Sequence, residues 1–73
     1  MKREYKILSS ITGGINETYN NIEDLNKRVN YIEQNKENFK NNKTIFIYVN
    51  IYNKNDKIVD NKRLKIIDFK EVN

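Results

Sequence analysis

Apolar residues near the start of the chain alternate with polar ones in the manner of a strand. Tyr5, Ile7 and Ile11 share one phase of residues 4–12. This period is typical of a strand because successive side chains leave opposite faces of a sheet. The only two glycines of the chain, Gly13 and Gly14, follow directly. We predict a first strand over residues 4–12 and a tight reversal at the glycines into a helix.

The spacing of apolar residues then changes to three or four positions. The residues concerned are Ile15, Tyr19, Ile22, Leu25, Val29 and Ile32. This spacing predicts one amphipathic helix over residues 15–38. Asn16 is the expected N-cap, because its side-chain oxygen can accept from amides of the first turn. A start one or two residues earlier, with Glu17 in the first turn, fits the pattern equally well.

The most hydrophobic stretch, residues 44–53, has a strand period in which neither phase is polar. One phase is aliphatic and consists of Ile45, Ile47, Val49 and Ile51. The other contains Phe46, Tyr48, Asn50 and Tyr52. We expect the aliphatic phase to pack on Ile22, Leu25, Val29 and Ile32 of the helix. One helix covers one face of a sheet, so the aromatic phase needs a different covering.

Residues 57–70 read as a return strand after a polar turn at 53–56. The alternation of apolar and polar residues in this strand is interrupted at residues 60–62, which indicates a bulge or a second tight turn. The predicted fold class is α+β: a single β-α-β-β domain over residues 1–73, with a three-stranded sheet and one amphipathic helix on one face. The right-handed crossover rule makes the first two strands parallel and the third antiparallel to both. The strand order stays open, although the strand at 44–53 is slightly favoured at the centre.

The aromatic phase is the first candidate binding surface. Three coverings remain open: a segment of the same chain (the N-terminal segment or residues 35–43), a second copy in a homodimer, or another molecule. Exposed apolar patches usually mark interfaces, and Tyr gives a large contact area with a polar tip. The residues predicted to form this protein-binding or dimer interface are Phe46, Tyr48, Tyr52 and Phe69.

A second candidate surface comes from the charge distribution. The net charge is +4, and residues 36–73 carry all of the excess, with nine basic and five acidic side chains. Beside aromatic residues, such cations could form a stacking platform for nucleic acid or a surface for an acidic partner. The alternative is a solvated set of lysines along a sheet edge. The residues in question are Lys54, Lys57, Lys62, Arg63 and Lys65.

The composition argues against chemistry in this chain. There is no cysteine and no histidine, which removes disulfides, thiolate metal sites and the usual proton shuttle at neutral pH. Ser9, Ser10 and Thr12 have no base near them in sequence, and the aspartates of the second half match no metal-binding loop. We therefore expect no enzyme activity, no metal, no cofactor and no small-molecule substrate.

Localisation and origin follow from a few further observations. The charged residues 1–6 are not followed by an apolar run, so we expect no signal peptide. No stretch approaches about 18 consecutive apolar residues, so no membrane span is expected, and the lack of cysteine fits the cytoplasm. Asn (14), Lys (11) and Ile (11), whose codons are A/T-rich, make up about half of the chain. This bias indicates a low-GC bacterium or one of its phages.

Together these features predict a small non-enzymatic protein-binding module. In concrete terms, we expect a phage or mobile-element accessory protein that inhibits a host defence complex by occupying its surface. The alternative is a small basic regulator that binds nucleic acid. The first depends on the aromatic surface and the second on the basic one.

Overall fold

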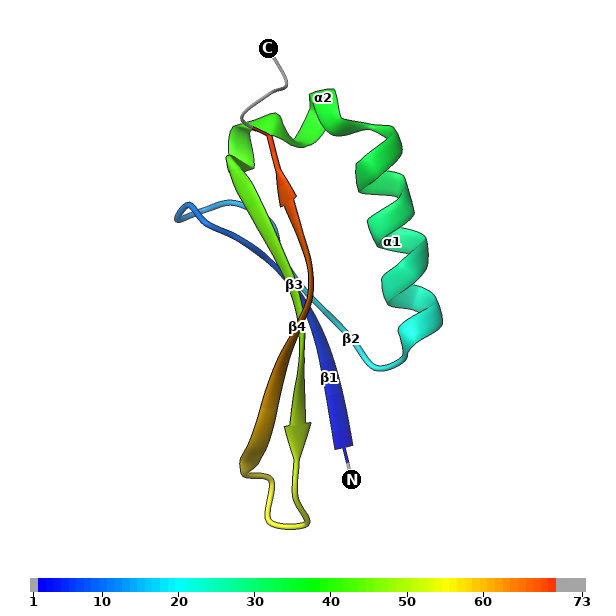
Figure 1. Cartoon of the computed structure of the whole chain (residues 1–73), viewed down its shortest axis with the longest axis vertical. Helices are drawn as coiled ribbons and strands as arrows, with labels where there is room; N and C mark the ends of the chain where they lie inside the picture. Colours follow the sequence, from blue (N-terminus) through cyan, green and yellow to red (C-terminus); the bar gives the residue numbers. More distant parts are fainter. Residues whose placement is uncertain (1, 70–73) are drawn as a thin grey trace.

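Two β-hairpins joined by a helical connection make up the computed structural model, which describes residues 2–69 (Figure 1). The hairpins consist of β1 (Lys2–Ser9), β2 (Asn16–Tyr19), β3 (Thr44–Tyr52) and β4 (Ile58–Asp68). The connection consists of α1 (Ile22–Gln34), α2 (Lys36–Phe39) and the 3-10 turn η1 (Lys40–Asn42). No helix within the described residues is long and apolar enough to cross a membrane.

The four strands form one sheet in the order β2-β1-β3-β4, and every neighbouring pair is antiparallel. The predicted α+β class is confirmed, but the three-stranded sheet and the parallel pairing of the first two predicted strands are wrong. The cause is β2, whose residues fall in the predicted helix because of the spacing of Ile15 and Tyr19. Two apolar residues four positions apart fit an alternating strand as well as a helical turn. Because β2 reverses the chain before α1, no parallel crossover forms.

The glycine pair makes the turn of this first hairpin. Gly13 has a φ of +84°, a left-handed conformation that favours glycine. A side chain on Gly14 would collide with the Ser9 side chain and with Oδ1 of Asn42. That Oδ1 atom accepts a hydrogen bond from the backbone N–H of Ile15 at 2.8 Å. The turn therefore leads into a strand and not into the predicted helix, and Asn42 holds it against η1.

Helix α1 starts later and ends earlier than predicted. Its N-cap is Asn21, whose side chain accepts from the backbone N–H of Asp24 at 2.9 Å, so the predicted cap at Asn16 is wrong. Asn35, with φ −130° and ψ 41°, separates α1 from α2. Polar residues with capping side chains occur throughout this region of the sequence, so several starting points fit the pattern equally well.

The second hairpin has the predicted turn, and its irregularities are bulges. Oδ1 of Asn53 accepts from the backbone N–H groups of Asn55 at 2.8 Å and Lys57 at 3.1 Å. The pairing register shifts twice, which leaves Val59 and Leu64 of β4 without a counterpart in β3. These bulges flank residues 60–62, where the sequence pattern predicts a single interruption. The predicted end of the strand at residue 70 lies outside the described residues.

The core lies between α1 and one face of the sheet. Its buried members are Ile7, Leu25, Val29, Ile32, Ile45, Ile47, Ile67 and Phe69. Ile45 and Ile47 of β3 belong to this cluster together with Leu25, Val29 and Ile32 of α1, as predicted, whereas Val49 and Ile51 lie outside it. Ile22, which is 39% exposed, is the predicted helix contact that lies outside this cluster.

Candidate functional site

The face of the sheet opposite α1 is here called the open face, because no helix of the described residues covers it (Figure 1). The pairing register places the aromatic phase of β3 on this face. The side chains of Phe46, Tyr48 and Tyr52 are half-buried there. The segment 35–43, one predicted covering, does not reach it: Phe39 packs against the core on the α1 side. The described chain therefore leaves its aromatic face open.

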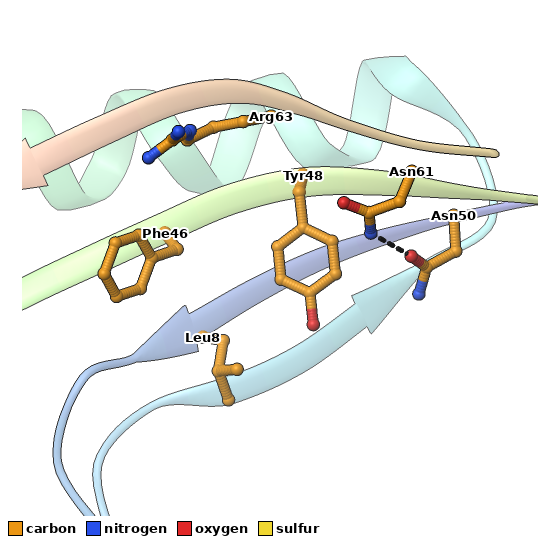
Figure 2. A pocket seen from close by; sticks show the side chains of 6 residues that line it. All are labelled: Leu8, Phe46, Tyr48, Asn50, Asn61 and Arg63. Carbon is orange, nitrogen blue, oxygen red and sulfur yellow. Dashed lines mark hydrogen bonds between the residues drawn. The ribbon is translucent and has the colours of Figure 1, made fainter.

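A shallow hollow of about 600 Å³ lies in the middle of the open face. Its lining comes from β1, β3 and β4 and consists of Leu8, Phe46, Tyr48, Asn50, Asn61 and Arg63. Figure 2 shows the Tyr48 ring extending from β3 across β1, with the Arg63 side chain on the β4 side. The side-chain amide of Asn61 donates to Oδ1 of Asn50. The floor is thus partly aromatic and partly amide.

Arg63 is the cation of this hollow. It is exposed, and within residues 2–69 its guanidinium has no hydrogen bond or ion pair. Lys65, two residues further along β4, instead donates to both carboxylate oxygens of Glu33 at 2.8 Å. A guanidinium carries several donors in a fixed fork that matches a carboxylate or a phosphate. The hollow therefore presents an unused anion-binding group beside two aromatic rings.

The part of the open face near the start of β1 carries its own polar contacts. The Glu4 carboxylate accepts hydrogen bonds from the Tyr52 hydroxyl at 2.9 Å and from Nδ2 of Asn50 at 3.4 Å. The Tyr52 bond is the main reason that the pKa of Glu4 is lowered and that of Tyr52 raised. The Lys2 ammonium lies 5.4 Å from the centre of the Tyr52 ring. Glu4 is therefore already engaged by its neighbours.

Charged side chains beside α1 are paired instead. Glu17 of β2 accepts two hydrogen bonds from Arg28, each 2.9 Å long, and one from the Tyr19 hydroxyl at 2.7 Å. Burial raises the pKa of the Glu17 carboxyl, but these hydrogen bonds and the Arg28 charge outweigh it, and the pKa is lowered. The guanidinium of Arg28 also lies 5.3 Å from the Tyr31 ring centre and 5.4 Å from that of Phe39. This cluster joins β2 to α1 and has a structural role.

The basic residues singled out from the sequence do not form one surface. Lys54 and Lys57 lie at the tip of the second hairpin. Lys62 pairs with Val49 and Lys65 with Ile47, so both lie on the α1 side of the sheet, whereas Arg63 lies on the open face. The predicted basic set is therefore divided among the hairpin tip and the two faces of the sheet, because adjacent strand residues point to opposite faces.

Phe69 is also misplaced by the sequence reasoning. It is 4% exposed and belongs to the core, so it does not join Phe46, Tyr48 and Tyr52. In turn, no pattern in the sequence indicates that Leu8 and Asn61 line the same hollow. Their positions depend on an antiparallel register between strands far apart in the chain, and no local pattern encodes it.

Comparison of the chain with known protein families, with curated proteins and with solved structures finds no match. Within residues 2–69, no group of three or more carboxylate, imidazole or thiol side chains could hold a metal ion. The geometry of the open face is therefore the feature of this chain that points to a function.

Proposed function

We propose that this chain is a small non-enzymatic module that binds another protein through its open face. The observation that carries the proposal is a half-buried aromatic surface, not covered by any described element, around a hollow with an unpaired arginine. Aromatic residues and Arg are the side chains that contribute most to protein interfaces. The hollow is shallow, which suits a protruding group of a larger partner better than an enclosed small molecule.

In its concrete form, the proposal is an accessory protein of a phage or mobile element that acts in the cytoplasm. It would inhibit a host complex by occupying part of its surface. This part of the proposal is supported by the small size, the lack of cysteine and the A/T-rich codon bias of Asn, Lys and Ile. The open face supports only the binding step.

The alternative, a regulator that binds nucleic acid, has less support. Its basic residues are divided between the hairpin tip, the α1 side and the open face. One of them, Lys65, is engaged by Glu33. Nucleic-acid affinity grows with the number of phosphates contacted together, and a divided set contacts few of them.

Site-specific photo-crosslinking in a low-GC bacterial host tests the proposed function. A photoreactive phenylalanine derivative replaces Tyr48 in one variant and Tyr31, which is 49% exposed on α1, in the matched control. We expect the variant at position 48 to capture a defined protein that the control does not. Phe46→Ala should then weaken binding of that protein by about tenfold or more, a typical loss for a central interface residue. Equal crosslinking patterns at positions 48 and 31 would contradict the proposal.

A further inference from the structure

The register arranges the side chains of the open face in rows that run across the strands. Residues Leu8, Phe46 and Ile66 occupy paired positions and form an apolar row. The next row consists of Lys6, Tyr48 and Arg63, and is here called the cationic row. Beyond it, Glu4, Asn50 and Asn61 form a polar row. Successive rows are roughly 7 Å apart along β1 and β3, because their members are two positions apart on these strands.

The charge of the cationic row is not neutralised by direct ion pairs within residues 2–69. Nζ of Lys6 donates to two neutral oxygens, Oγ1 of Thr18 at 2.7 Å and Oδ1 of Asn16 at 3.3 Å. Arg63 has no hydrogen bond or ion pair among the described residues. The carboxylate in the adjacent polar row belongs to Glu4, and it accepts hydrogen bonds from Tyr52 and Asn50. The register thus places one cationic residue on each side of Tyr48, with the apolar row next to them.

We propose that the occupant of the open face is an acidic segment of the partner protein, bound in an extended conformation. One of its carboxylates lies over Tyr48 between Lys6 and Arg63, and a large apolar side chain lies on Phe46. In an extended chain, side chains at positions i and i+2 point the same way and have the same spacing of roughly 7 Å as the rows. The recognised motif is therefore an Asp or Glu two positions from a large apolar residue. This inference rests on the proposed function and specifies its partner.

A second copy of the chain fits this face less well. When two copies pack face to face, the cationic row of one copy lies against the cationic row of the other, or against one of the rows beside it. The carboxylates that the register places on the open face within residues 2–69 are Glu4 and Asp68. Glu4 is already engaged, and Asp68 lies at the far end of β4, away from the cationic row. Like charges in opposition disfavour association, so the charge pattern favours an acidic partner over self-association.

Selection from a phage-displayed library of random dodecapeptides tests the inference. We expect peptides that bind the wild-type protein to be enriched in an acidic residue two positions from a large apolar one. Arg63→Glu should weaken these peptides by about tenfold or more, because it places like charges in contact. The same charge reversal at the next residue, Lys62→Glu, lies on the α1 side and serves as the matched control. Its affinity for these peptides should change by less than about threefold, as for a solvated charge outside the contact.

Three results would overturn the inference. In the first, the selected peptides are not enriched in acidic residues. In the second, the Arg63→Glu variant binds the selected peptides with the same affinity as the Lys62→Glu variant. The third is tight, salt-sensitive binding of a fifteen-nucleotide oligothymidine that Arg63→Glu abolishes, which assigns the cationic row to nucleic acid. A failure of this inference can be distinguished from a failure of the proposed function. If crosslinking at position 48 captures a partner but the peptides are not acidic, the open face binds protein and only the stated chemistry is wrong.

Discussion

The two faces of β3 have the same backbone and similar hydrophobicity, yet they meet different surroundings. On the α1 side, Ile45, Ile47 and Val49 are 0%, 2% and 5% exposed. On the open face, Phe46, Tyr48 and Tyr52 remain half-buried. The neighbouring charges differ as well: Glu17 and Glu33 beside α1 are paired with Arg28 and Lys65, whereas Arg63 in the hollow has no such partner among residues 2–69. A covering element, and not hydrophobicity alone, makes one face core and leaves the other available.

The largest expected effect comes from truncating a side chain beneath the helix. Ile47→Ala should lower the free energy of unfolding by about 2–5 kcal/mol, because the side chain is 2% exposed and its removal leaves a cavity. That loss is comparable with the roughly 3–5 kcal/mol of core stability usual for so small a domain. Urea unfolding followed by circular dichroism measures it. Phe46→Ala, the adjacent position on the open face, should cost clearly less. Equal losses would show that the open face is a second core.

The next effect concerns the turn that holds the first hairpin against η1. Gly14→Ala should cost about 1–3 kcal/mol, because the new methyl group collides with the Ser9 side chain and Oδ1 of Asn42. Gly13→Ala is the matched control: nothing lies near its would-be Cβ, and only its positive φ opposes alanine. In thermal unfolding, the melting temperature of Gly14→Ala should be lower than that of Gly13→Ala. The opposite order would mean that the positive φ at position 13 costs more stability than the steric clash at position 14.

A smaller, pH-dependent effect is expected at the ion pair beside α1. The pKa of Glu17 in the folded protein is below its ordinary value of 4.5, so its contribution to stability is present above pH 4.5. The contribution is lost as the pH falls through the lowered pKa. Glu17→Gln should therefore cost about 1 kcal/mol at pH 7, and the difference from wild type should shrink in acid. A difference that does not change between pH 7 and acid would contradict this account.

The smallest effect concerns the carboxylate of the open face. The pKa of Glu4 is lowered mainly by the hydrogen bond from the Tyr52 hydroxyl. Tyr52→Phe removes that donor, so the pKa of Glu4 should rise toward its ordinary value, with little change in stability. A carbon-detected NMR titration of the Glu4 carboxyl group measures the shift. Tyr48→Phe, whose hydroxyl has no such bond to Glu4 among residues 2–69, should leave the titration of Glu4 unchanged.

Several features of the fold were predictable from local patterns. The alternation of β3, the three α1 contacts Leu25, Val29 and Ile32, and the turn at residues 53–56 all follow from side-chain period or turn chemistry. These signals are local, because each depends on residues within a few positions of one another. They were therefore visible in the sequence.

The remaining features depend on contacts between distant segments. β2 has only four residues, NETY, and its strand conformation comes from pairing with β1, whereas its sequence alone fits a helix equally well. The placement of Leu8 beside Phe46 depends on the register of β1 with β3, and that of Arg63 beside Tyr48 depends on the bulged register of β3 with β4. Of the candidate site, the aromatic residues of β3 could be identified from the sequence, but the row of cations that flanks Tyr48 could not.

The central position of β1 also bears on how the chain folds. β1 pairs with its sequence neighbour β2, for example Tyr5 with Tyr19, and with the distant β3, for example Tyr5 with Val49. The first pairing closes a short loop, while the second must enclose the whole helical connection, a larger loss of chain entropy. The first hairpin can therefore form early, but its apolar face stays in contact with water until α1 and β3 arrive. Mutations that strengthen the Gly13–Gly14 turn should accordingly speed folding, and stopped-flow refolding rates would show whether this turn belongs to the folding nucleus.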